Sequence, residues 1–382
     1  MVVAAWRRRT MPAACDFKFA AEHDGCPAGM ARGASGAPGL LRDASGAPCV
    51  PFRRPHAAAV PASLRVFHVA KTATTSLVKE LEQRLPTRVR TDEGCWSGVN
   101  RETWTANLTA PSATSVLLRH PRAHLLSMYR HCRYSGWGRW RSASFPRNGT
   151  LVAGFGKWLA HFQELRERAP RVGRRVAKGL WWSGWGCYHP LDPQTRAMTC
   201  ENRPGCADNC YLEAMPVRTW DWRENATLAP ALSSLAQAQF AGVTELYDVH
   251  LCLLLHAHSP RPNLLPSGCE CGGRAVRRRR RVRIAHEWPV GHPKRAPPAR
   301  VDELPPAVLA SLDALTRSDA HLYVAALRRT IALARALEAR VRQRLLCRSH
   351  LEPLRAELGY LPGAREAIDE ALRDAPWVFR VS

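Results

Sequence analysis

One lysine stands in a short run of small and hydroxyl-bearing residues. The segment Leu64 to Leu77 reads LRVFHVAKTATTSL, in which Lys71 precedes Thr72, Ala73, Thr74, Thr75 and Ser76. The lysine supplies a point charge and the threonines and serine supply hydroxyl donors. Both suit a phosphate that is attached to a leaving group gaining negative charge. These residue types predict an anion-binding loop.

The residues around this loop predict the elements that position it. Val66 to Val69 show a strand pattern, and the apolar residues from Leu77 to Leu85 recur at helical spacing. A strand, a tight loop and a helix in that order direct free backbone N–H groups and the positive helix end toward the loop. No glycine occurs between Leu64 and Leu77, so this is not a Walker loop. An ordinary turn with a capped helix is the alternative interpretation.

A second polar pair follows a second apolar strand pattern. Residues 115–129 read SVLLRHPRAHLLSMY, with Arg119 directly after the strand and Ser127 in the helix predicted to follow Pro121. A guanidinium forms paired hydrogen bonds with phosphate, and a hydroxyl can add another. The segment predicts a second phosphate subsite.

Together these segments resemble the sulfotransferases that use 3′-phosphoadenosine 5′-phosphosulfate. KTATTS is similar to that family's 5′-phosphosulfate loop, K-T-[AG]-[GST]-[TS]-[ST], and R-x-P-x(5)-S is similar to its 3′-phosphate motif. FHVAKT resembles the opening found in the Golgi carbohydrate branch, of heparan and uronyl type. Three further segments, beginning at Cys187, Gly242 and Leu304, resemble other parts of that branch, so the resemblance spans about residues 63–347.

The resemblance implies a fold, a reaction and a set of binding residues. The fold is a three-layer α/β domain of the P-loop-like sulfotransferase type with a central, mainly parallel sheet. The reaction is transfer of a sulfuryl group from 3′-phosphoadenosine 5′-phosphosulfate to a carbohydrate hydroxyl, without a metal. Lys71 and the residues Thr72 to Ser76 would hold the 5′-phosphosulfate, and Arg119 with Ser127 would hold the 3′-phosphate.

The general base is expected between the two motifs. Members of the family use a glutamate or a histidine after the first helix, and residues 88–104, RVRTDEGCWSGVNRETW, contain no histidine. Glu93 is therefore the candidate base, with Asp92 second, and both are otherwise ordinary turn acids. His131 could face the cleft, but we expect it at the surface.

Residues 137–222 are rich in tryptophan and cysteine and are predicted to form the acceptor side. Aromatic rings stack on sugar rings, although they can equally pack an insertion held by disulfides. Within the family-like loop CYHPLDPQTRAMTC, Gln194 and Arg196 are expected to contact the acceptor or to order the loop.

The chain carries 56 Lys and Arg against 32 Asp and Glu, a net charge of +24. Such a charge attracts polyanions, and a run of arginines, RRRRRVR at 277–283, lies in a predicted basic loop at 272–300. We expect a glycan or nucleotide ligand and no nucleic acid. A non-catalytic polyanion-binding protein and a nucleotide-dependent kinase remain the other two classes.

The predicted domains are a low-complexity arm (1–62), the sulfotransferase-like domain (63–347) and a tail (348–382) with one short helix. No stretch reaches the roughly 18 apolar residues that span a bilayer, and no signal peptide is recognised, so we expect a soluble chain. Because members of the resembling branch are usually membrane-anchored, either the anchor is missing from this sequence or the protein is targeted in another way.

Sequons and cysteines nevertheless favour the Golgi lumen or the secretory pathway. Three N-x-T sequons occur, at Asn107, Asn148 and Asn225, and thirteen cysteines predict disulfides more than zinc. Because the number of cysteines is odd, at least one thiol is free, and Cys252 is expected to be a buried one.

Overall fold

The computed structural model describes residues 41–42, 48–49, 63–92, 112–136, 138, 145–168, 188–199, 228–271, 300–361 and 363–373. The chain divides into two units, Met1–Arg54 and Pro55–Ser382. In the first unit, strands β1 (Leu41–Arg42) and β2 (Pro48–Cys49) pair antiparallel, and most of the predicted arm lies outside the described residues. The second unit contains both predicted phosphate motifs.

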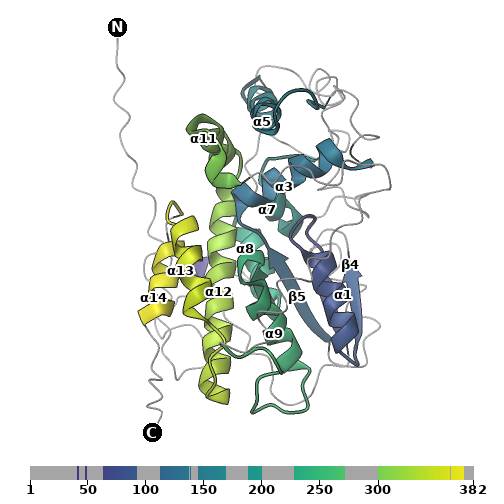
Figure 1. Ribbon diagram of the computed structural model, residues 1–382, viewed down its shortest axis with the longest axis vertical. Coiled ribbons are helices and arrows are strands. Elements are labelled where there is room, and N and C mark those ends of the chain that lie inside the picture. Colours follow the sequence, from purple (N-terminus) through teal and green to yellow (C-terminus); the bar gives the residue numbers. More distant parts are fainter. Residues whose placement is uncertain are drawn as a thin grey trace. The chain divides into compact units, whose positions relative to one another are not determined.

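A four-stranded parallel sheet is the centre of this unit (Figure 1). Its strands are β3 (Ser63–Phe67), β4 (Arg88–Asp92), β5 (Ser112–Leu118) and β6 (Phe240–Val243), in the spatial order β4-β3-β5-β6. Leu64, Val66 and Phe67 of β3 are fully buried, as expected for a parallel strand covered on both faces. The prediction of an α/β fold with a central parallel sheet is confirmed.

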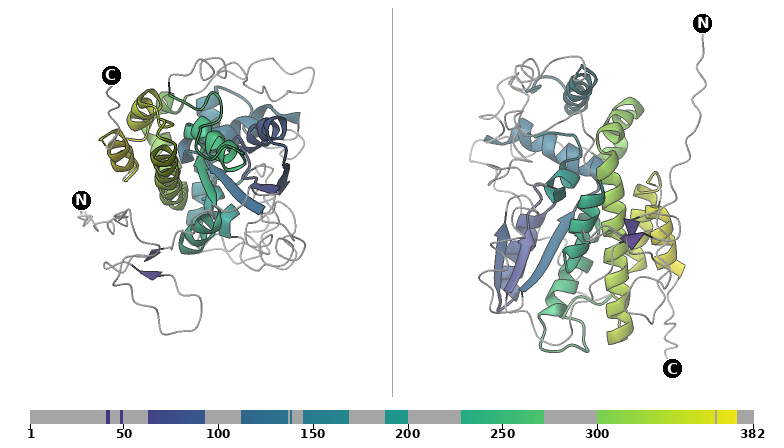
Figure 2. Two further views of the ribbon diagram at one scale, coloured as in Figure 1. Left: turned by 90° about the horizontal axis from the view of Figure 1, so that it is seen from below. Right: turned by 180° about the vertical axis from the view of Figure 1, so that it is seen from behind.

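Helices cover and flank this sheet (Figure 2). α1 packs on β3, β4 and α9, whereas α12 packs on β6 and contacts α7, α8 and α9. The two short 3-10 helices are η2 (Thr244–Leu246) and η3 (Val301–Glu303). The described α-helices are α1 (Thr74–Arg84), α3 (Pro121–Tyr134), α5 (Leu151–Arg168), α7 (Pro193–Thr199), α8 (Leu228–Gln237), α9 (Tyr247–Ala257), α11 (Pro306–Leu315), α12 (Arg317–Val341), α13 (Arg348–Glu357) and α14 (Ala364–Arg373).

The strands and helices around both motifs occur where the sequence predicts them, with shifted ends. The first strand ends at Phe67, two residues before the predicted Val69, and α1 begins at Thr74, three residues before Leu77. The loop is consequently tight, because few residues separate the strand from the helix. In the tail, the structure has two helices, α13 and α14, where one was predicted, and α14 packs on α12.

Two disulfides connect loop and helix segments of the described chain. They are Cys252–Cys269 and Cys271–Cys347. The expectation that Cys252 is a free thiol is wrong: the apolar pattern of α9 correctly buries it, but the following loop folds back and brings Cys269 to a Cα separation of 5.7 Å. Disulfides are typical of an oxidising, secretory-type environment, and the sequon residue Asn148 is exposed.

Within the described residues, none of the helices combines the length and the hydropathy that crossing a bilayer requires. The most apolar side chains instead build a core between helices and sheet. Trp158 of α5, for example, is fully buried among Tyr129 and Phe155, with ring centroids 5.8 and 6.0 Å away. Trp158 is therefore a packing residue of the tryptophan-rich region and not a surface on which a sugar could stack.

Candidate functional site

The loop between β3 and α1 has an unusual backbone for a segment without glycine. Lys71 and Ala73 both have left-handed backbones, with φ of 64° and 63°. A left-handed non-glycine residue costs roughly 1–2 kcal/mol, and such residues gather where ligands are clamped. Because α1 begins at Thr74, the N–H groups of its first turn are directed at the loop.

The hydroxyl groups of the loop fall into two sets. Thr72 and Thr74 are buried; the Thr72 hydroxyl donates to the Val69 carbonyl at 2.8 Å and lies 2.9 Å from the Thr74 hydroxyl. These two side chains hold the loop in shape. Thr75 is exposed and Ser76 is half-buried, so their hydroxyls are the ones placed to meet a ligand.

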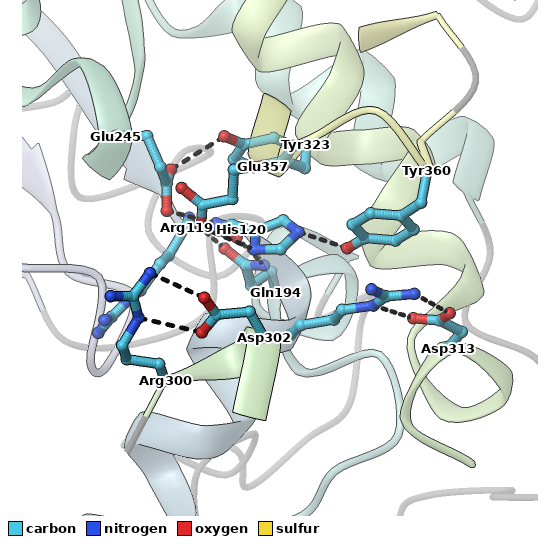
Figure 3. A network of polar contacts seen from close by, with 11 residues as sticks. Arg119, His120, Gln194, Glu245, Arg300, Asp302, Asp313, Tyr323, Glu357 and Tyr360 are labelled. Carbon is cyan, nitrogen blue, oxygen red and sulfur yellow. Dashed lines mark hydrogen bonds and ion pairs between the residues drawn. The ribbon is translucent and has the colours of Figure 1, made fainter. Parts of the chain in front are cut away.

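Arg119 comes to this loop from the end of the adjacent strand β5. Its Nη1 donates to the carbonyl oxygen of Lys71 at 3.1 Å, so the two predicted subsites adjoin. The side chain of Gln194, on α7, holds the backbone of Arg119: Oε1 accepts from the Arg119 N–H and Nε2 donates to its carbonyl, both at 2.8 Å. Gln194 is fully buried and orders the site (Figure 3).

The Lys71 ammonium and the Arg119 guanidinium are therefore neighbouring cations that are both poorly solvated. Burial, and next the charge of Arg119, lower the pKa of Lys71 to about 8. Burial also lowers the pKa of Arg119, with Glu245 opposing this effect and Arg130 adding to it. A bound anion would offset the repulsion between Lys71 and Arg119.

One face of α3 covers the loop. His124, Ser127 and His131 are three and four residues apart and so lie along the same face. Nε2 of His124 is 2.7 Å from the Ala70 carbonyl oxygen, and Nδ1 of His131 is 3.2 Å from the Lys71 ammonium nitrogen. Ser127 lies between these two contacts, which places it over the loop. Its convergence with Arg119 stays a prediction.

His131 differs from the surface residue that we expected. It is half-buried, its ring centroid lies 5.9 Å from that of Tyr188, and its Nδ1 faces Lys71. An ammonium can only donate a hydrogen bond, so this contact requires Nδ1 to be an acceptor. The helical spacing from Ser127 was the available signal, since His131 follows it by four residues.

The segment after β6 closes the site from the other side. The Thr244 hydroxyl lies 3.0 Å from the carbonyl oxygens of both Thr72 and Leu118. Glu245 accepts from the N–H of His120 at 3.1 Å and from the Tyr323 hydroxyl at 3.0 Å, and burial raises its pKa although Arg119 counteracts the rise. Sequence analysis identified this segment only through its resemblance to a family.

The C-terminal helices also reach the site, which the sequence did not indicate. Tyr360, in the turn between α13 and α14, forms a short hydrogen bond with Nε2 of His120. The guanidinium of Arg122 lies 3.3 Å from the centre of the Tyr360 ring and binds Asp313 through two hydrogen bonds of 2.8 and 2.5 Å. The residues that follow Arg119 are thereby fixed from α11 and from the tail.

Other expected site residues have different places. Nε of Arg196 donates to the Leu191 carbonyl at 3.0 Å, so it orders its own loop. Glu93 and the arginine run 277–283 lie outside the described residues. Asp92 is the last residue of β4 and pairs with Phe67, which brings the strand end before Glu93 next to the loop. No group of three or more metal-ligating side chains occurs in the described part of the chain.

Comparison with known proteins adds no assignment. No family model matches the chain, and neither a curated protein nor a solved structure matches it. The described residues place the start of α1, two cationic side chains and nearby hydroxyls at the carboxyl edge of a parallel sheet. Open α/β sheets commonly bind ligands at such an edge, and a helix N-terminus beside cations suits an anion.

Proposed function

We propose that the protein is a sulfotransferase that uses 3′-phosphoadenosine 5′-phosphosulfate and acts on a hydroxyl of a carbohydrate, in the Golgi lumen or elsewhere in the secretory pathway. The supporting observation is the contact of Arg119 with Lys71, which puts two cationic subsites at the ends of adjacent strands. A nucleotide with phosphates at two positions suits this pair. The fold would then be the three-layer sulfotransferase type.

Each residue has a role in this reaction. The acceptor oxygen forms a bond to sulfur while the bond from sulfur to the 5′-phosphate oxygen breaks, and the hydroxyl proton passes to a base, for which Glu93 remains the candidate. Lys71 and the loop amides would stabilise the charge developing on the departing phosphate. Arg119 and Ser127 would hold the 3′-phosphate.

Two other classes compete with this proposal. A non-catalytic polyanion-binding protein is favoured by clustered positive charges: besides burial, Arg119 lowers the pKa of Lys71, and Arg130 lowers the pKa of Arg119. A nucleotide-dependent kinase is disfavoured because ATP has no 3′-phosphate for Arg119 and because the loop lacks Walker glycines.

A transfer assay separates these classes. The full chain is incubated with sulfur-labelled 3′-phosphoadenosine 5′-phosphosulfate and a panel of desulfated glycans, and label on the glycan is counted. We expect turnover that Lys71→Ala abolishes, whereas Lys79→Ala, which removes an exposed lysine of α1, leaves it unchanged. Lack of turnover on every acceptor, with salt-sensitive glycan binding, would favour the polyanion-binding class.

A further inference from the structure

The hydroxyl of Thr244 contacts two segments that do not belong to its own strand. Thr244 follows β6, which pairs with β5 but not with β3. Its Oγ1 nevertheless lies 3.0 Å from the Leu118 carbonyl at the end of β5 and 3.0 Å from the Thr72 carbonyl in the loop after β3. A hydroxyl has one proton to donate, so the two carbonyl oxygens share it in a three-centre hydrogen bond and both lie next to the same oxygen atom.

These two carbonyls belong to the residues beside the two candidate phosphate ligands. Lys71 directly precedes Thr72, and Arg119 directly follows Leu118. Holding both carbonyls at one hydroxyl therefore fixes the separation of the backbones that carry the ammonium and the guanidinium. Pairing of β3 with β5 also holds these two segments together, up to Phe67 and Val116. Beyond the strand ends, the 3.1 Å contact from Arg119 Nη1 to the Lys71 carbonyl is a further link, but it uses the ligand-binding group itself.

Gln194 also holds the backbone of Arg119. Its amide group binds both the N–H and the carbonyl of Arg119, each at 2.8 Å. Its own position is set by Asp319 of α12, whose carboxylate accepts from the N–H groups of Gln194 and Thr195 at 3.1 and 2.7 Å. The chain at Arg119 is thus attached to α7 and α12 as well as to Thr244.

We infer that Thr244 and Gln194 are positioning residues that set the distance between the two phosphate subsites. This inference rests on the proposed function and adds a determinant of specificity to it. A ligand that occupies both subsites gains affinity only while their spacing is fixed, because the second contact is then intramolecular. Neither side chain has to contact the nucleotide to produce this preference.

The test is the ratio of two affinities, for adenosine 3′,5′-bisphosphate and for AMP, measured by calorimetry on the full chain. Thr244→Val keeps the shape but removes the hydroxyl, and we expect the preference for the bisphosphate to fall by about tenfold. Thr244→Ser restores the hydroxyl and should restore the preference. Gln194→Met removes both amide contacts and should also lower the preference for the bisphosphate. This variant tests the inference even if Thr244→Val does not fold.

Thr330→Val is the matched control. Thr330 is a buried threonine of α12 whose hydroxyl lies 3.1 Å from the Ala241 carbonyl of β6, away from both subsites. It should lower the unfolding temperature without changing the affinity ratio. A wild-type preference that survives Thr244→Val and Gln194→Met would overturn the inference alone. Absence of any preference in the wild type would overturn the proposed function and the inference with it.

Discussion

The ammonium group of Lys71 lies where burial and the charge of Arg119 both oppose protonation. Its pKa, lowered to about 8, places the loss of its charge within the range of ordinary assays. A phosphate bound beside it would favour the protonated form and raise this pKa again. Binding of a phosphate at Lys71 would therefore be coupled to proton uptake.

We expect the affinity for adenosine 3′,5′-bisphosphate to fall as the pH rises above about 8, by up to about tenfold per pH unit. The free site is then losing the proton that the bound state keeps, whereas the phosphates stay fully ionised above pH 7. Calorimetry at pH 7, 8 and 9 measures the slope. Lys71→Arg should flatten it, and equal slopes in both proteins would contradict this assignment.

For single residues, the sequence indicated which side chains belong to the candidate site better than it indicated which groups they contact. The proximity of Lys71 and Arg119 could be predicted because the carboxyl ends of parallel strands share one edge of the sheet. His131 was missed because its exposure depends on how α3 packs over the loop. Tyr360 gave no signal, since its contact with His120 joins residues 240 positions apart.

At the scale of elements, α9 packs on the sheet through a histidine that a glycine accommodates. Nε2 of His250 lies 2.9 Å from the Ser115 hydroxyl of β5, and a Cβ at Gly242 of β6 would lie 2.2 Å from His250 Nδ1. The imidazole thus occupies the space that any other residue at 242 would fill. This contact fixes α9 over the two strands that carry Arg119 and Thr244.

Gly242→Ala should lower the free energy of unfolding by about 1–3 kcal/mol, because His250 or β6 must move. Urea unfolding followed by circular dichroism measures the change. Gly359→Ala is the control: its nearest neighbours lie at 3.6 Å, so no loss from overpacking is expected there. Equal stability of Gly242→Ala and wild type would show that the packing is looser than described.

The elements themselves were largely predictable, because the alternating and helical apolar patterns around both motifs are strong. The ends of the elements were less predictable, because the left-handed backbones of Lys71 and Ala73 tighten the loop and start α1 early. The Cys252–Cys269 pairing could not be predicted, since apolar periodicity shows that Cys252 is buried but not which loop returns to it.

For the whole molecule, several histidines are buried in the neutral form. Burial is the main cause that lowers the pKa of His120, His124 and His250 to about 3 in each case. The unfolded chain binds these protons below about pH 6.5 and the folded chain does not. Their contribution to stability is therefore lost as the pH falls from about 6.5 toward 3.

We expect His250→Gln to weaken this acid destabilisation between pH 7 and 5. The slope of the free energy of unfolding against pH should fall by the equivalent of about one bound proton. Glu245 and Asp319 act in the opposite sense, because burial raises their pKa values and favours folding at low pH. The quantity to measure is accordingly the difference in the free energy of unfolding between variant and wild type, by urea unfolding at a series of pH values. If this difference is the same at every pH, His250 is protonated in the folded protein.

The whole chain is also the proper material for testing function. The family resemblance ended near residue 347, yet α14 packs on α12, and Tyr360 contacts both His120 and Arg122. Removing the tail would expose the residues that follow Arg119. Binding experiments on a chain that ends at 347 would therefore confuse a damaged site with an absent one.

Lys71 and Arg119 are proposed to form one site for a nucleotide with two separate phosphates. Calorimetric titration of the full chain with adenosine 3′,5′-bisphosphate, AMP and ATP tests it most directly. We predict micromolar binding of the bisphosphate, weaker binding of AMP and ATP, and loss of the preference in Arg119→Ala but not in Arg348→Ala, which removes an exposed arginine of α13. Equal binding of all three nucleotides, or a preference that survives Arg119→Ala, would contradict the account.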